Sequence, residues 1–192
     1  MLKKLLEIDR YLFLKINKDC SNPFFDTVMP FFREPKFWAP LYLFILVFII
    51  LNFGKKAAWW CIGAIITVAL TDIISSKIIK PFFARPRPCM DLDFSAQVRL
   101  VADYCGGNGS FTSSHASNHF GLAMFLFVTL HHLAPKFVKY FFVWAALICL
   151  AQIYVGVHYP SDVIGGALIG IFIGNFVGKF YNNKNGLLQP SL

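Results

Sequence analysis

Long apolar runs separated by short polar turns make up most of the chain after position 36. An α-helix rises about 1.5 Å per residue, so roughly 20 apolar residues cross the hydrocarbon core of a bilayer. Five runs approach that length, and they lie at 37–53, 57–79, 115–133, 136–157 and 160–181. The pattern therefore predicts an all-α fold, an integral membrane helical bundle of about five transmembrane helices.

The residues before these runs follow a different pattern. Between Leu2 and Ile16, apolar residues recur at approximately helical spacing with charged residues between them, which is typical of an amphipathic helix in the membrane interface. Ser21-Asn22-Pro23 breaks this helix, and the apolar piece from Phe24 to Phe32 is too short to span. The alternative is that both pieces simply pack on the bundle. We predict N-terminal interfacial helices at 1–36, a transmembrane domain at 37–182 and a polar tail at 183–192.

Composition supports a membrane protein and argues against a nucleic-acid-binding one. Hydrophobic residues make up 57% of the chain and charged residues 15%, whereas soluble domains carry about 25% charged residues. The net charge is +8, but the basic residues are scattered among apolar segments, so an anionic membrane surface or an anionic substrate is the expected partner. Nucleic acid is not expected.

Lysines in the short loops indicate an orientation. One face of the predicted bundle carries acid-free loops with the basic residues Lys55, Lys56, Lys136 and Lys139. The positive-inside rule makes that face cytoplasmic. In a bacterium, the protein would then lie in the inner membrane, with the long polar loop at 81–114 facing the periplasm. Cys89 and Cys105 bracket much of this loop, and an oxidising compartment would allow them to form a disulfide.

Three polar groups fall at that same face of the bundle. The first is Lys80 with Arg87, and the second is the Ser113-Ser114-His115 turn, which begins an apolar helix whose free N–H groups suit a phosphate. The third contains Gln152, His158 and Asp162. Each group has a simpler reading: helix caps, interfacial basic residues or a buried histidine–carboxylate pair. Their convergence from separate segments favours an anion-binding site.

These groups resemble the motifs of the type 2 phosphatidic acid phosphatases, which share a site with vanadium haloperoxidases. The family pattern is Lys, six residues, Arg-Pro; then Pro-Ser-Gly-His; then Ser-Arg, five residues, His, three residues, Asp. Lys80 with Arg87-Pro88 matches the first motif, and residues 112–115 match the second with Thr for Pro and Ser for Gly. Ala151-Gln152, His158 and Asp162 match the third in spacing.

The resemblance implies a metal-independent phosphatase that needs no cofactor. It assigns His158 as the nucleophile, Asp162 as the group that orients its imidazole, and His115 as the proton donor to the leaving oxygen. The implied phosphate-binding groups are Lys80, Arg87, Ser113, Ser114 through its backbone N–H, and Gln152. A phosphoryl group in transfer needs such fixed donors around its oxygens.

Gln152 is the main departure from the family pattern. It stands where the family has arginine, and glutamine brings neither a charge nor a fork of donors. Arg85 or Arg99 of the polar loop is a candidate for the missing charge. Otherwise the site is slow, or it is tuned to a less charged substrate. The Ser114 change is milder, because only its backbone N–H is needed.

The expected substrate is a lipid phosphate monoester or diphosphate, such as phosphatidate, phosphatidylglycerol phosphate, a prenyl diphosphate or a lipid A phosphate. Two alternatives use the same residues: a lipid phosphotransferase, or a non-catalytic lipid-phosphate binding or transport protein with a degenerate site. A metal site on His115 and His119 with Asp103 is a weaker alternative, because lysine and arginine surround those histidines. The glycine series from Gly166 to Gly178 allows close helix packing, including with a second copy in a homo-oligomer.

Overall fold

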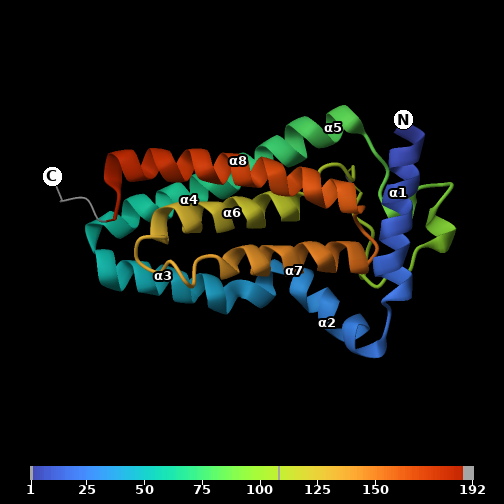
Figure 1. Cartoon of the computed structure of the whole chain (residues 1–192), viewed down its shortest axis with the longest axis horizontal. Helices are drawn as coiled ribbons and strands as arrows, with labels where there is room; N and C mark the ends of the chain where they lie inside the picture. Colours follow the sequence, from blue (N-terminus) through green and yellow to red (C-terminus); the bar gives the residue numbers. More distant parts are fainter. Residues whose placement is uncertain (1, 108, 188–192) are drawn as a thin grey trace.

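The computed structural model describes residues 2–107 and 109–187. These residues form helices and loops without a β-strand, so the predicted all-α class is confirmed. The long helices lie side by side along the length of the molecule, while α1 stands across one end of them (Figure 1). We call that end, near the start of α8, the site end. The long helices are α3 (Ala39–Phe53), α4 (Lys55–Ile73), α6 (Ser114–Leu130), α7 (Tyr140–Tyr154) and α8 (Pro160–Asn185).

Within the described residues, three helical stretches are long and apolar enough to cross a membrane. They are Pro35–Phe53, Lys55–Met90 and Pro160–Asn185, with mean hydropathies of 1.9, 1.8 and 1.7. The stretch through α4 continues as the π-helix η3 (Ile74–Ile79) and the short α5 (Lys80–Phe83). The helices α6 and α7 are shorter, at 17 and 15 residues.

The expected bounds of the third and fourth helices were wrong at the turn between them. The structure ends α6 at Leu130 and begins α7 at Tyr140, with turns in between. Pro135 explains the break, because a proline disfavours helical conformation in the residue before it. The last helix, in turn, is longer than expected and continues to Asn185. Part of the predicted polar tail, residues 188–192, lies outside the described residues.

Glycines on α8 let it pack directly on the backbone of α6. A Cβ atom at Gly170 would lie 2.3 Å from the carbonyl oxygen of Ser117, and one at Gly174 would lie 2.2 Å from that of Gly121. Such distances exclude any larger residue unless the helices separate. The expected close packing is therefore found within one chain, where it brings the N-terminus of α6 next to the N-terminus of α8.

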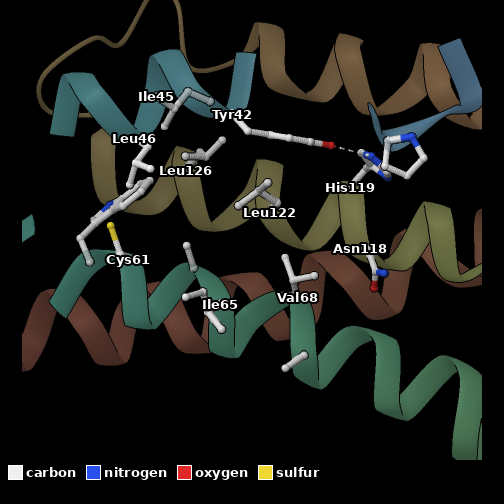
Figure 2. Close-up of a pocket in the computed structure, with 14 residues that line it drawn as sticks. Tyr42, Ile45, Leu46, Cys61, Ile65, Val68, Asn118, His119, Leu122 and Leu126 are labelled. Atoms are coloured by element: carbon white, nitrogen blue, oxygen red, sulfur yellow. Dashed lines mark hydrogen bonds between the residues drawn. The ribbon is translucent and has the colours of Figure 1, made fainter. Parts of the chain in front are cut away.

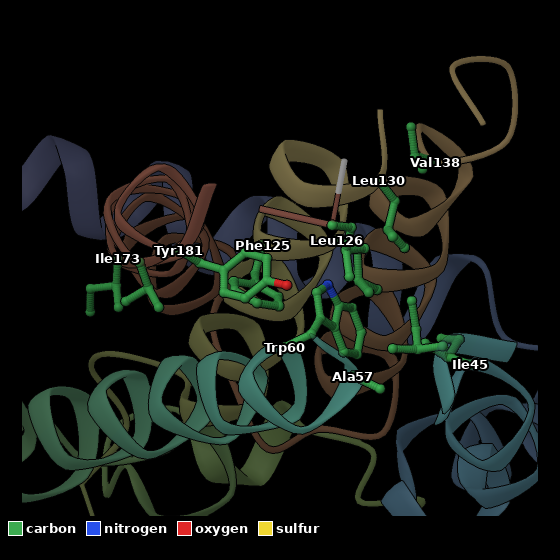
Figure 3. Close-up of a cluster of buried hydrophobic side chains, with 12 residues drawn as sticks. Ile45, Ala57, Trp60, Phe125, Leu126, Leu130, Val138, Ile173 and Tyr181 are labelled. Carbon is green, nitrogen blue, oxygen red and sulfur yellow. The ribbon is translucent and has the colours of Figure 1, made fainter. Parts of the chain in front are cut away.

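An apolar core holds the opposite end of the bundle together (Figure 3). Trp60 of α4 lies 5.4 Å from the ring of Phe125 on α6, and Phe125 lies 6.1 Å from Tyr181 on α8. The indole N–H of Trp60 donates a 3.0 Å hydrogen bond to Thr129, so its polar atom is satisfied in the core. This cluster fixes three helices at one end and thereby sets their spacing at the other.

The N-terminal segment packs on the site end of the bundle. It consists of α1 (Leu2–Leu14), the π-helix η1 (Lys15–Asp19) and α2 (Pro23–Arg33). Asn17 is buried and donates 2.7 Å hydrogen bonds to the carbonyl oxygens of Arg99 and Tyr154. These bonds support the alternative that the segment packs on the bundle, while its position at a membrane interface stays a prediction.

The polar loop between α5 and α6 covers the same end of the molecule. It contains the short 3-10 helices η4 (Pro88–Met90) and η5 (Ser95–Gln97). Cys89 and Cys105 form a disulfide with their Cα atoms 6.1 Å apart, as the sequence allowed. The bridge holds the segment that follows Arg87 against the segment that leads to α6.

Candidate active site

The predicted site residues come from five segments and lie at the site end. His158 occupies the centre, buried with 1% of its surface exposed. Its Nε2 lies 3.2 Å from Nη1 of Arg87, and its Nδ1 lies 3.6 Å from Oδ2 of Asp162. Lys80 is also buried and interacts electrostatically with both Arg87 and Asp162. These four residues, which were grouped by their spacing in the sequence, therefore lie together in the structure.

The turn between α7 and α8 places His158. Gly156 has a φ of +93°, a conformation that suits glycine, and a Cβ there would lie 2.6 Å from the carbonyl oxygen of Arg99. The sharp turn directs the chain back, and Pro160 then begins α8. Asp162 accepts a 2.8 Å hydrogen bond from the backbone N–H of Tyr159. The carboxylate is therefore held next to the imidazole by the helix start itself.

Contacts of His158 define its protonation. Asp162 and the hydroxyl of Ser110 both face Nδ1, with Ser110 Oγ at 3.5 Å, and Ser110 also donates a short hydrogen bond to Asp162. A proton on Nδ1 leaves the Nε2 lone pair directed at Arg87. Burial lowers the pKa of His158 to about 4, although the contact with Asp162 acts in the opposite direction. The imidazole of His158 is consequently neutral at neutral pH.

Arg85 holds the other oxygen of Asp162. Its Nη1 lies 2.9 Å from Oδ1 of Asp162, and its Nη2 lies 2.7 Å from Oδ2 of Asp9 on α1. Asp9 also accepts hydrogen bonds from the backbone N–H and hydroxyl of Ser161, at 2.9 and 2.5 Å. The N-terminal helix is thus connected to the site through buried charges.

Both arginines that were expected to compensate for Gln152 are ion-paired in the structure. Arg85 is occupied by the two carboxylates described above. Arg99 donates to Asp26 at 2.8 Å and to the carbonyl oxygen of Asn17 at 3.0 Å, so it joins the N-terminal segment to the loop. A sequence does not say which acid each arginine pairs with, and compensation for Gln152 by either arginine stays a prediction. The amide Nε2 of Gln152 is buried and has no hydrogen-bond partner among the described residues.

The start of α6 presents His115 to the site. Ser113 caps the helix by accepting a 3.4 Å hydrogen bond from the N–H of Ala116, and this leaves its own O–H as a donor. The hydroxyl of Ser114 lies 3.0 Å from those of Ser75 and Ser76 on η3, so its side chain points away toward that helix. His115 interacts electrostatically with His158.

The hydrogen bonds of His119 disfavour a metal site at His115 and His119. Its Nδ1 lies 2.7 Å from the carbonyl oxygen of His115, and its Nε2 lies 3.2 Å from the hydroxyl of Tyr42. Both nitrogens are therefore engaged. Across the described parts of the chain, no group of three or more histidine, cysteine or acidic side chains forms a site able to hold a metal ion.

Sequence reasoning gave no role to Ser110, Asp9 or Arg33. Ser110 and Asp9 contact Asp162 and Arg85 across separations of 52 and 76 residues. Arg33, the last residue of α2, is buried and interacts electrostatically with His115 and Arg87. The only sequence signal for Arg33 was a charge at the end of a short apolar helix, which is also what a helix terminus prefers.

Two cavities adjoin these residues. One, of about 570 Å³, is polar and is lined by Lys80, Arg85 and Arg87 among others. The second, of about 700 Å³, is apolar and lies between α3, α4 and α6, where Tyr42, Ile65 and Leu122 point into it (Figure 2). Its lining includes Asn118 and His119, within one helical turn of His115. A cavity lined by basic residues and a separate apolar groove, both near predicted site residues, suit a molecule with an anionic head and hydrocarbon chains.

Comparisons with known proteins agree with this arrangement. The family model of the PAP2 superfamily matches residues 56–186. A lipid A 4'-phosphatase of Porphyromonas gingivalis is 34% identical over 183 residues, which cover 92% of this chain and 74% of that protein. A lipid A 4'-phosphatase of Bacteroides thetaiotaomicron is also 34% identical, over 91% of this chain and 77% of that protein.

Solved structures show the same architecture. The crystal structure of Aquifex aeolicus LpxE superposes with a TM-score of 0.64 at 28% identity, covering 88% of this chain and 93% of that one. A transmembrane PAP2-type phosphatidylglycerolphosphate phosphatase from Bacillus subtilis gives a TM-score of 0.69 at 20% identity, over 97% and 90% of the two chains. The second likeness concerns the fold alone.

Proposed function

Because this chain belongs to the PAP2 superfamily, we propose that it is a membrane lipid phosphatase that removes a phosphate group from lipid A. The observation that carries the proposal is the buried His158, whose Nε2 faces Arg87 and whose Nδ1 faces Asp162. Two relatives named lipid A 4'-phosphatases, similar over more than 90% of this chain, support lipid A as the substrate among lipid phosphates.

The reaction proceeds in two displacements at phosphorus. In the first, the lone pair on Nε2 of His158 forms a P–N bond while the bond between phosphorus and the sugar oxygen breaks. His115 gives its proton to that leaving oxygen. In the second, His115 accepts a proton from water, the water oxygen attacks phosphorus, and the P–N bond breaks to release inorganic phosphate and neutral His158.

Fixed donors stabilise the charge that develops on the phosphoryl oxygens. Lys80 and Arg87 supply positive charge, and Ser113 and the backbone N–H of Ser114 supply hydrogen bonds from the start of α6. Gln152 contributes an amide N–H from α7. Asp162 keeps the His158 proton on Nδ1 and stabilises the positive charge that the imidazole acquires when the P–N bond forms.

The site suits a lipid held in a bilayer. The acyl chains of the substrate would lie along the apolar groove between α3, α4 and α6, while its phosphate reaches His158 at the site end. The disulfide between Cys89 and Cys105 supports an oxidising compartment for this end, which in a bacterium means the periplasmic side of the inner membrane. Lysines in the loops of the opposite face agree with that orientation.

A substrate panel tests the proposal. The detergent-solubilised protein is assayed for phosphate release from lipid A, phosphatidate, phosphatidylglycerol phosphate and a prenyl diphosphate. We expect lipid A to give the highest kcat/KM, and His158→Ala to abolish release from every substrate. Phosphate transfer to a second lipid instead of water, detected by product analysis, would identify a phosphotransferase. Release by His158→Ala at the wild-type rate would contradict the mechanism.

A further inference from the structure

The site lacks a positive charge at position 152, where Gln152 stands in place of the family's arginine. At this position the structure offers a neutral amide whose Nε2 is buried without a partner among the described residues. A phosphoryl group in transfer carries close to two negative charges, and one missing donor typically costs 10²–10³-fold in rate. A further cation would make up this loss; the charge of Arg85 is shared between Asp9 and Asp162, and Arg99 is paired with Asp26.

Arg33 is a buried guanidinium at the right end of the molecule. Only 6% of its surface is exposed, and it interacts electrostatically with both Arg87 and His115. It thus approaches the site from α2, on the side of α7, against which α2 packs. The same packing places Arg33 and Gln152 on elements that contact each other.

Among the described residues, Arg33 has one long ion pair and one aromatic contact. Its nearest acid is Glu34, whose Oε1 lies 3.7 Å from Nε and whose side chain is 49% exposed. Nε itself is buried and donates no hydrogen bond to a described residue. The centroid of the Tyr104 ring lies 5.5 Å from the guanidinium carbon, a cation–π contact that does not use the N–H groups as hydrogen-bond donors.

A buried cation beside other cations is costly unless an anion joins them. Arg87 interacts electrostatically with both Lys80 and Arg33, whereas the carboxylate of Asp162 is already paired with Arg85. A phosphate that enters this cluster of cations supplies the negative charge that the cluster lacks. The arrangement therefore indicates a site that binds an anion. Without the anion, the buried positive charges repel one another.

We propose that Arg33 binds the phosphoryl group of the substrate and supplies the charge that Gln152 does not. The guanidinium comes from the N-terminal segment, so the segment before the first spanning helix forms part of the phosphate site. This assignment rests on the proposed function for the identity of the substrate. The binding chemistry itself requires only a tetrahedral oxyanion.

Moving the positive charge from position 33 to position 152 tests the assignment. Arg33→Gln should lower kcat/KM for lipid A about 10²–10³-fold, the scale of one lost oxyanion donor. Adding Gln152→Arg to that variant should restore a large part of the loss, because the charge returns from α7. Arg33→Lys, which keeps a charge but not the planar fork, should fall between wild type and Arg33→Gln. Lys36→Gln is the matched control, since Lys36 is basic, near in sequence and exposed, and it should keep the wild-type rate.

Orthovanadate, a phosphate analogue, gives a readout that does not depend on turnover. Its binding to the detergent-solubilised protein is measured by calorimetry, and Arg33→Gln should weaken it by roughly tenfold or more, as expected for a lost charged hydrogen bond. A wild-type rate in Arg33→Gln would overturn the proposal, as would a lost rate with unchanged vanadate affinity. If the wild type hydrolyses no lipid phosphate, the proposed function fails, while vanadate binding still decides the role of Arg33.

Discussion

Replacement of Gly170 by alanine tests whether the contact between α6 and α8 sets the catalytic geometry. The new Cβ would lie 2.3 Å from the carbonyl oxygen of Ser117, whereas ordinary contact begins at 3.4 Å, so the two backbones must separate locally by about 1.1 Å. Both are helix backbone, so no flexible side chain absorbs the change. His115 on α6 would move relative to Asp162 on α8.

The size of the effect follows from that displacement. A misplacement of about 1 Å between reacting groups costs on the order of 10²-fold in rate, and overpacking costs about 1–3 kcal/mol of stability. We expect Gly170→Ala to lower kcat about 10²-fold for the best substrate, with a lower apparent Tm. The assay is phosphate release in detergent, with unfolding followed on the same sample.

Gly178→Ala is the matched control on the same face of α8. Its Cβ would meet the side chain of Val128, at 2.9 Å, instead of a backbone oxygen, and it lies toward the end of α8 far from the site. This variant should lose some stability but retain most of its rate. Equal rates for wild type and Gly170→Ala would refute the claim that close packing of α6 and α8 positions the site.

Three further results are expected. Asp9→Asn removes the carboxylate that pairs with Arg85, so kcat should fall about tenfold or more on the scale of a charged hydrogen bond, while Asp19→Asn on the exposed η1 should not change it. Because burial lowers the pKa of His158 to about 4, histidine NMR should show it neutral from pH 7 down to about pH 5 and protonated only below, and a midpoint near the ordinary 6.5 would contradict its burial. Replacing Cys89 and Cys105 by serine should cost about 3 kcal/mol of stability for a bridge across 16 residues, whereas replacing the free, exposed Cys20 should cost nothing measurable.

The bundle was predictable because its signal is local. Apolar runs of helical length appear directly in the sequence, and counting crossings placed Lys80, His115 and His158 at one end. The turn after Leu130 was harder, because the apolar run continues through it and only Pro135 marks the break. Helix existence therefore follows from composition, while helix ends depend on single residues.

The charge network was not predictable, because it depends on contacts between distant segments. Asp9 meets Arg85 across 76 residues, and Arg99 meets Asp26 across 73. The sequence does not indicate which of these arginines pairs with which aspartate, so Arg85 appeared as a candidate phosphate ligand. Arg33 was missed for the same reason: its burial at the end of α2 depends on how α2 packs against α7.

Capture of the covalent intermediate is the sharpest test of His158 as the nucleophile. The protein is mixed with lipid A carrying a radioactive phosphate, quenched at alkaline pH during turnover, and digested for mass spectrometry. We expect a phosphoryl group on the imidazole of His158, lost on return to acid and absent from His158→Ala. Phosphate release without label on His158, or with label on another residue, would contradict it.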